Sequence, residues 1–236
     1  MSSTDFGPEG TPNGGLVVAV DGTSGSGKSS TCRGVALRLG LHYLDTGAQF
    51  RAMTWWMLRE GVSVLDPAAV AARAGEPLIE SGTDPNAPTI HVNGVDVSGE
   101  IRSNAVNAAV SPVSTVADVR ARLLELQRSI VSREIAAGAG IVVEGRDIGS
   151  VVWPEAPVKV FLTADPVARA SRRAAEEGGS DLTTTQETLI ERDRIDSGRA
   201  TAPLVMADGA VHIDTTAYTL EEVIDLVSDL VTQVSA

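Results

Sequence analysis

The sequence predicts an α/β fold of three layers, in which helices cover both faces of a parallel five-stranded sheet. Short apolar runs alternate with segments of helical periodicity from Leu16 to the C-terminus. These runs are apolar throughout, which is typical of parallel strands buried on both faces. A chain of 236 residues with 43% hydrophobic content can bury one full core. We therefore expect one domain with a small inserted lobe.

The predicted strands and helices alternate along the chain. The strands are expected at residues 16–21, 42–44, 141–144, 158–163 and 210–214. The helices are expected at residues 28–39, 47–60, 116–137, 165–177, 184–197 and 219–234. The last helix has a clear start, because Thr219 and Glu222 form a capping-box pattern ahead of an apolar stripe. This order predicts parallel strands joined by crossover helices.

Two stretches depart from the alternation. Residues 75–100 hold turn clusters and the pair Asn93-Gly94 between short alternating runs, which predicts a small antiparallel β insertion with an Asn-Gly hairpin. Residues 1–14 carry Gly, Pro, Ser and Thr without apolar periodicity, and we expect them to form a disordered lead-in. The folded domain is therefore expected to span residues 15–236.

The composition restricts the class of protein. The formal net charge of −12 argues against the broad basic surface of a nucleic-acid-binding protein. The apolar runs are far shorter than a membrane span, and the N-terminus lacks the pattern of a secretory signal. The single cysteine, Cys32, excludes an internal disulfide and a multi-cysteine zinc site. We expect a soluble cytoplasmic monomer that binds neither membranes nor nucleic acid.

The most informative motif follows the first predicted strand. Within DGTSGSGKSS, the spacing from Gly22 to Ser29 is the phosphate-loop pattern Gly-x-x-x-x-Gly-Lys-[Ser/Thr]. Glycines let consecutive backbone N–H groups point at one anion, and the next helix adds the positive end of its dipole. We expect Lys28 to bridge the β- and γ-phosphates and the Ser29 hydroxyl to ligate Mg²⁺. A flexible Gly/Ser turn is the alternative, and the flanking strand and helix disfavour it.

Two other classes of phosphate-loop protein fit less well. A GTPase needs an Asn-Lys-x-Asp motif, and Asn93-Gly94-Val95-Asp96 lacks the lysine. A motor or transport ATPase usually ends a strand in the Asp that holds magnesium, whereas the strand at residues 141–144 ends in Glu144. A small kinase instead needs a second anion site for the acceptor and arginines near the transferring phosphoryl group.

Three clusters suit a small kinase. After the second strand, DTGAQFR offers Thr46, which can cap a helix, and Arg51 on the same element. After the third strand, EGRDIG places Arg146 and Asp147 at the carboxyl end, where open α/β sheets bind ligands. In ERDRIDSGR, residues of one helix face recur at i, i+4 and i+7: Arg192, Asp196 and Arg199. Taken alone, Arg192 with Asp196 is more typical of an ordinary exposed helix pair.

The combination of motifs resembles a known family. The stretches DGTSGSGKSS, LDTGAQFR, VDVSGEIR, EGRDIGSVVWPEAPVKVFL and ERDRIDSGRATAPL are similar, in order and spacing, to the motifs of bacterial cytidylate kinases. The resemblance extends from residue 16 to the C-terminus. It implies transfer of the γ-phosphoryl group of ATP to CMP or dCMP, with Mg²⁺, giving ADP and CDP or dCDP in pyrimidine nucleotide metabolism.

The resemblance also implies a division of the chain. It implies a three-layer P-loop kinase fold with a parallel five-stranded sheet and an Arg-rich lid at about residues 169–200. The NMP-binding lobe would span about residues 46–115 and include the β insertion. The remaining core would comprise residues 15–45, 138–165 and 205–236.

Individual residues take roles from the resemblance. The loop would hold ATP through Gly22, Thr23, Ser24, Gly25, Ser26, Gly27, Lys28, Ser29 and Ser30. The arginines that flank ATP would be Arg169, Arg172 and Arg173, which taken alone could equally form a solvated helix face. The CMP phosphate would be held by Thr46, Arg51 and Arg146, and the cytosine read by Ser111, Arg120 and Asp147. The lid, ribose and phosphate contacts would include Arg192, Asp196 and Arg199. The residues expected to act on the transferring group are Lys28, Arg146, Arg192 and Arg199.

The chemistry of cytosine agrees with the expected base-reading set. Cytosine presents an N4 amino donor beside acceptors at N3 and O2, which a carboxylate such as Asp147 and a forked donor such as Arg120 complement. Uracil would leave a buried group unpaired, so we expect discrimination against UMP. Phe50 and Glu144 depart from residues that some family members have, Tyr and Asp. Two alternatives remain: a kinase of this fold for another small acceptor, and a non-catalytic ATP-binding regulatory module.

Overall fold

The computed structural model describes residues 15–176, 181–199 and 201–235, and the lead-in expected at residues 1–14 lies outside them. Five strands form the central sheet in the order β2-β6-β1-β7-β8. All of the pairings in this sheet are parallel. The predicted α/β class and parallel five-stranded sheet are confirmed. The strands are β1 (Val17–Gly22), β2 (His42–Asp45), β6 (Ile141–Glu144), β7 (Val158–Thr163) and β8 (Val211–Asp214).

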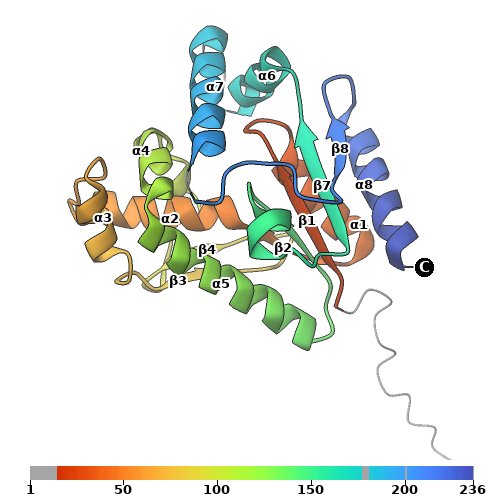
Figure 1. Cartoon of the computed structure of the whole chain (residues 1–236), viewed down its shortest axis with the longest axis horizontal. Coiled ribbons are helices and arrows are strands. Elements are labelled where there is room, and N and C mark those ends of the chain that lie inside the picture. Colours follow the sequence, from red (N-terminus) through yellow and green to blue (C-terminus); the bar gives the residue numbers. More distant parts are fainter. Residues whose placement is uncertain (1–14, 177–180, 200, 236) are drawn as a thin grey trace, which may run out of the picture.

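Helices cover both faces of this sheet, as Figure 1 shows. Val18 and Val20 of β1 belong to the apolar core shared with α1 and α8. Val17 and Ala19, which point to the opposite face, belong to the core shared with α5. The apolar run at residues 17–20 is uninterrupted because β1 is buried on both faces of the sheet. These helices are α1 (Lys28–Leu39), α5 (Ala117–Ala136) and α8 (Leu220–Ser235).

A lobe with its own apolar core lies at the far side of the molecule from α8 (Figure 1). The predicted antiparallel insertion is confirmed as a sheet in the order β3-β4-β5. Asn93 and Gly94 both have positive φ, 52° and 77°, as the predicted Asn-Gly hairpin turn requires. The lobe consists of α2 (Thr46–Arg59), α3 (Pro67–Arg73), β3 (Ile79–Ser81), β4 (Ile90–Val92), β5 (Val95–Asp96), a 3₁₀ helix (Glu100–Arg102) and α4 (Asn104–Thr115).

Two helices of the lobe were not expected from the sequence. The helix α3 is only 7 residues long, so it lacks the repeated apolar spacing that identifies a helix. The helix α4 contains Pro112 in its interior, which is normally a sign that a helix stops. The six helices predicted from the sequence are confirmed to within two residues at each end that the structure describes.

The carboxyl ends of the parallel strands meet at one edge of the sheet, beneath α6 (Pro166–Glu176) and α7 (Leu182–Gly198). These two helices pack against each other, and α7 also approaches α4 of the lobe. The site therefore lies where strand ends, lobe and lid helices converge. The proposed limits of core, lobe and lid stay predictions. In the described part of the chain, every helix falls short of the length and hydropathy that crossing a membrane requires.

Candidate active site

The phosphate loop connects the end of β1 to the start of α1. Gly22 has a φ of 144°, and a Cβ at this position would lie 1.9 Å from the carbonyl oxygen of Leu162 on β7. Only glycine fits so close to a neighbouring strand. Gly27 is the N-cap of α1 with a φ of 87°, and among the described residues no side chain caps this helix. The first amides of α1 are therefore available to an anion.

Two cations meet at one carbonyl oxygen of the loop. Lys28 Nζ donates hydrogen bonds to the carbonyl oxygens of Gly22 (2.9 Å) and Thr23 (2.6 Å). Arg146 Nη1 donates to the same Gly22 oxygen at 2.7 Å. Burial, followed by the charge of Arg146, lowers the pKa of Lys28 to about 7. A polyphosphate between these groups would relieve their repulsion and restore the charge on the lysine.

Glu144, at the end of β6, is a buried carboxylate beside the loop. Its Oε2 accepts a hydrogen bond from Ser29 Oγ at 3.0 Å, and its Oε1 accepts one from the Tyr43 hydroxyl. Burial and the charge of Asp45 raise the pKa of Glu144 to about 7. Mg²⁺ in kinases takes one or two protein oxygens and completes its shell with water and substrate phosphates. The hydroxyl of Ser29 and the carboxylate of Glu144 therefore fit the expected metal.

Thr46 begins α2 but does not cap it, so this expectation was wrong. Asp45 occupies the N-cap, and its Oδ1 accepts a hydrogen bond from the amide of Ala48 at 2.9 Å. A carboxylate one residue earlier takes the capping position. The Thr46 hydroxyl instead donates to the carbonyl oxygen of Glu144 at 2.7 Å. Thr46 is thus fixed at the junction of β6 and α2, facing the cavity.

Arg120 and Asp147 form a buried ion pair on the other side of the site. Each residue is 7% exposed, and Arg120 Nη2 contacts Asp147 Oδ2. Arg120 Nη1 also donates to the carbonyl oxygen of Ser114 at 3.2 Å, and its guanidinium lies 5.4 Å from the Phe50 ring centroid. Desolvation raises the pKa of Asp147 despite the attraction of Arg120. The pair places a carboxylate beside a forked donor.

Several arginines around the cavity retain unused donors. Among the described residues, the buried atoms without a hydrogen-bond partner include Arg120 Nε, Arg192 Nε and Arg199 Nη2. Buried donors of this kind are rarely left unsatisfied unless a ligand or water completes them. Burial, followed by the charge of Arg146, lowers the pKa of Arg192 to about 10. The arrangement is therefore prepared for an anionic ligand.

Asp21 holds the backbone that follows Arg146 and Asp147. Its Oδ1 accepts a hydrogen bond from the amide of Ile148 at 2.7 Å, and its Oδ2 accepts one from Gly149 at 2.8 Å. These amides begin a π-helix, Ile148–Val152, of the kind often found at functional sites. Burial raises the pKa of Asp21 to about 6. Asp21, which precedes the phosphate loop, thus also holds the segment that follows Asp147, which the sequence did not indicate.

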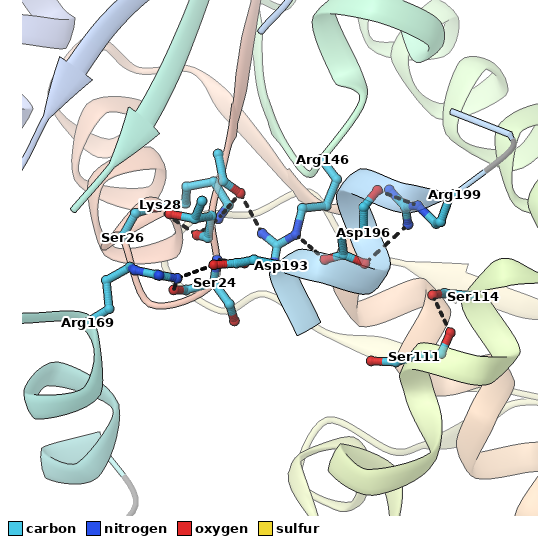
Figure 2. Close-up of polar contacts among 12 residues, drawn as sticks. Ser24, Ser26, Lys28, Ser111, Ser114, Arg146, Arg169, Asp193, Asp196 and Arg199 are labelled. Carbon is cyan, nitrogen blue, oxygen red and sulfur yellow. Dashed lines mark hydrogen bonds and ion pairs between the residues drawn. The ribbon is translucent and has the colours of Figure 1, made fainter. Parts of the chain in front are cut away.

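Two carboxylates of α7 contact different parts of the site, as Figure 2 shows. Asp196 Oδ2 accepts a hydrogen bond from Arg146 Nε at 2.8 Å, and Asp196 Oδ1 lies 3.5 Å from Arg199 Nη1. Asp193 instead accepts from the amide of Ser24 at 3.2 Å and from Arg169 Nη1. Arg169 Nη1 also donates to the carbonyl oxygen of Ser24 at 3.0 Å. The sequence analysis predicted a role for Asp196, whereas it gave Asp193 no role although this residue lies in the same motif, ERDRIDSGR.

One cavity of about 200 Å³ brings most of the predicted residues together. Predicted residues that line it are Ser24, Gly25, Gly27, Lys28, Ser29, Ser30, Thr46, Arg51, Ser111, Arg120, Arg146, Asp147, Arg173, Arg192, Asp196 and Arg199. Predicted residues outside the described lining are Gly22, Thr23, Ser26, Arg169 and Arg172. Lining residues to which the sequence assigned no role include Asp45, Phe50, Ile101, Arg102, Ser114 and Glu144.

Arg172, like Arg169, is a predicted ATP-side arginine that lies outside the cavity lining. Its Nη1 and Nη2 donate to the hydroxyl (2.9 Å) and carbonyl (2.7 Å) oxygens of Thr215. The Thr215 hydroxyl in turn donates to the carbonyl oxygen of Ser26 at 3.0 Å. Arg172 therefore supports the phosphate loop from behind in this structure. Its expected contact with ATP stays a prediction.

The sequence of this chain is similar to those of known proteins along most of its length. The family model described as "Cytidylate kinase" matches residues 18–233. The chain belongs to the cytidylate kinase family. The cytidylate kinase of Streptomyces griseus is 57% identical over 221 residues, which cover 94% of each chain. The cytidylate kinase of Nocardia farcinica is 50% identical over 222 residues, covering 92% of this chain and 94% of the relative.

A solved structure supports the fold independently of the cytidylate kinase sequences. An uncharacterized protein from Eubacterium ventriosum aligns with a TM-score of 0.51 and 11% identity, covering 92% of this chain and 98% of that chain. At this level of identity the likeness concerns the fold alone. Membership of the cytidylate kinase family therefore rests on the sequence relatives.

Proposed function

We propose that the chain transfers the γ-phosphoryl group of ATP to CMP or dCMP, giving ADP and CDP or dCDP. The convergence of Lys28 and Arg146 on the Gly22 carbonyl carries this proposal. Lys28 belongs to the loop that suits the donor phosphates, and Arg146 follows the strand that faces the acceptor side. Direct transfer requires the donor and acceptor phosphates to meet at one point. These two cations mark that point.

On the donor side, the loop amides and α1 would bind the β-phosphate, and Lys28 would neutralise charge on the transferring group. Ser29 would ligate Mg²⁺, and Glu144 would hold the Ser29 hydroxyl in place through its hydrogen bond. When bound, Mg²⁺ supplies positive charge against the phosphate oxygens. Ser24 and Arg169, which are joined by Asp193, would close the loop around the outer phosphates.

On the acceptor side, Thr46, Arg51 and Arg146 would hold the CMP phosphate. Arg51 reaches the cavity while its Nη1 donates to Asn107 Oδ1 at 2.5 Å and to the Ile101 carbonyl oxygen at 3.1 Å. Burial and nearby Arg192 lower the pKa of Arg51 to about 10, so it stays charged at neutral pH. Its remaining donors are therefore held in place for an anion.

The cytosine would lie between α4 and the Arg120–Asp147 pair. Ser111 and Ser114 of α4 line the cavity there, and Ser114 Oγ donates to the carbonyl oxygen of Ser111 at 2.8 Å. Asp147 would accept a hydrogen bond from the N4 amino group, and Arg120 would donate to the ring acceptors. The lid arginines Arg192 and Arg199 would then face the phosphates as α7 excludes water.

A coupled ADP-release assay with CMP, dCMP, UMP, AMP and GMP tests this proposal. We expect turnover with CMP or dCMP to exceed that with UMP by on the order of 100-fold, because UMP leaves buried groups unpaired. Equal or greater turnover with AMP or GMP would favour a kinase of this fold for another acceptor. No ADP release with any acceptor would favour a non-catalytic ATP-binding module.

The variant Asp147→Ala separates these outcomes further. Loss of this carboxylate leaves Arg120 buried without its partner, so the KM for CMP should rise by on the order of 100-fold. The affinity for ATP should not change, because Asp147 lies outside the phosphate loop. The matched control is Asp229→Ala, which removes an exposed carboxylate of α8 that lies outside the cavity lining. Equal effects of the two variants on the KM for CMP would contradict the assignment of Asp147.

A further inference from the structure

Tyr43 joins the apolar core to the site through a single hydroxyl group. The residue is 2% exposed, and its ring belongs to the core cluster that also contains Cys32, Val35 and Val142. The register pairs Tyr43 with Val142 and Asp45 with Glu144, so Tyr43 lies two residues before the carboxyl end of β2. From there its hydroxyl donates a hydrogen bond to Glu144 Oε1. The ring is a core residue, and the hydroxyl reaches the polar site.

The two oxygens of Glu144 have different partners. Oε1 is held by Tyr43, and Oε2 accepts a hydrogen bond from Ser29 Oγ at 3.0 Å. Glu144 is 3% exposed, so a rotation of its carboxylate would leave both the phenol and the carboxylate oxygen unpaired in a buried environment. The Tyr43 hydroxyl therefore keeps Oε2 directed at Ser29.

We propose that Tyr43 is a positioning residue of the magnesium site, which orients the Glu144 carboxylate toward Ser29. Glutamate has three rotatable side-chain bonds, and a metal-binding carboxylate is commonly fixed by an outer hydrogen-bond donor. Tyr43 is such a donor and is itself immobilised by the core. The inference rests on the proposed use of Mg²⁺ with ATP, but it is independent of which acceptor the enzyme phosphorylates.

The variant Tyr43→Phe tests the inference because it removes one oxygen and keeps the ring in the core. The matched control is Tyr218→Phe, the same change at the only other tyrosine, which is 45% exposed. Binding of Mn²⁺ to the full chain with ADP is measured by electron paramagnetic resonance of the free ion. We expect the Mn²⁺ affinity of Tyr43→Phe to fall about 10-fold, and that of Tyr218→Phe to stay at the wild-type value.

Kinetics provide the second measurement. The Mg²⁺ concentration for half-maximal rate should rise by a similar factor in Tyr43→Phe, while the KM for CMP stays constant. A merely structural tyrosine would lower the thermal midpoint and leave the Mg²⁺ dependence unchanged. Equal Mn²⁺ affinities of Tyr43→Phe and the wild type would overturn the proposal.

A double-mutant cycle with Glu144→Asp shows whether Tyr43 acts through Glu144. The aspartate carboxylate is one methylene shorter and cannot reach Tyr43 and Ser29 together. Addition of Tyr43→Phe to Glu144→Asp should therefore leave the Mn²⁺ affinity unchanged, which is a strong departure from additivity. Additive losses would mean that Tyr43 acts by another route and would reject the inference.

One measurement keeps the phenol and remains valid if Tyr43→Phe does not fold. In Tyr218→Phe protein grown with fluorotyrosine, the single ¹⁹F signal comes from residue 43. Addition of Mg²⁺ to the ADP complex should shift this signal, and Mn²⁺ should broaden it. An unchanged signal would overturn the proposal. Metal binding to the ADP complex needs no acceptor. If Mn²⁺ affinity and the ¹⁹F signal respond as expected but the protein does not phosphorylate CMP, the proposed function is contradicted and the role of Tyr43 is not.

Discussion

The proposed donor half of the site is centred on one continuous stretch of chain, whereas the proposed acceptor half is assembled from α2, α4, α5, the end of β6 and α7. In the donor half, residues 22–30 follow one another, and the backbone itself supplies the anion-binding N–H groups. Gly22 and Gly27 have positive φ, which lets the loop curl, and contacts from Asp193 and Thr215 support it from outside this stretch. In the acceptor half, side chains such as Arg120 and Asp147 meet only because separate elements pack together.

This difference separates binding strength from selectivity. A backbone loop binds any polyphosphate of suitable length, because N–H groups and a helix N-terminus recognise charge. Selectivity for one base requires fixed side chains that would be left unpaired by the wrong ligand. The buried Arg120–Asp147 pair meets this requirement, since both groups are held away from solvent. Substitutions in the two halves should therefore change different kinetic constants.

The largest expected effect is that of Lys28→Met on turnover. Without this charge the donor half loses its contact with the transferring group, so kcat should fall by on the order of 1000-fold or more. The affinity for CMP should stay the same, because the acceptor half is built from other elements. Single-turnover kinetics and calorimetric titration with CMP measure the two quantities.

The other lysine of the chain provides the control for this variant. Lys159 Nζ donates only a hydrogen bond at 3.2 Å to the carbonyl oxygen of Asp208 among the described contacts. Lys159→Met should keep wild-type turnover. Retained activity in Lys28→Met would mean that the phosphate loop has been misassigned.

A smaller effect is expected from the two carboxylates of α7. Asp196→Asn should raise the KM for CMP by on the order of 10-fold, because Arg146 and Arg199 lose their anionic partner. Asp193→Asn should instead raise the KM for ATP by a similar factor, because its contacts are Ser24 and Arg169. Steady-state kinetics with each substrate varied in turn measure both constants.

Glu191→Gln, an exposed carboxylate of the same helix that pairs with Arg194, is the matched control. It should change neither constant. If Asp193→Asn and Asp196→Asn raise the same KM, the division of the site into a donor half and an acceptor half is wrong.

The same difference determines how much of the site the sequence could predict. The phosphate loop was identified from its own residues, since its chemistry depends on local spacing. The grouping of Arg51, Arg120 and Asp147 came from a family resemblance, because their positions are tens of residues apart. Asp193 and Tyr43 were given no role, because an acidic residue on a helix, even within the motif ERDRIDSGR, and an aromatic residue in a strand have ordinary structural roles.

For the fold as well, the success of the prediction depended on which signals the sequence carries locally. The sheet and the long helices were predicted because buried strands and amphipathic stripes repeat over many residues. The helix α4 was missed because Pro112 is a local signal against helix, which the packing of α4 in the lobe overrides. Thr46 was expected at a cap because the sequence offers two adjacent capping residues, and only the geometry selects Asp45.

The smallest effect concerns the stability of the ligand-free protein between about pH 7 and pH 9. Burial and the charge of Arg146 lower the pKa of Lys28 from 10.5 to about 7. In this range the unfolded chain binds more protons at Lys28 than the folded protein, so this residue makes the free energy of unfolding rise with pH. The Tm of the wild type minus the Tm of Lys28→Met should therefore rise by about 3 °C or more between these two pH values. Arg51→Met should show no such trend, because a pKa of about 10 keeps Arg51 charged throughout this range. A constant difference for Lys28→Met in differential scanning fluorimetry would show that the lysine keeps its proton in the empty donor half.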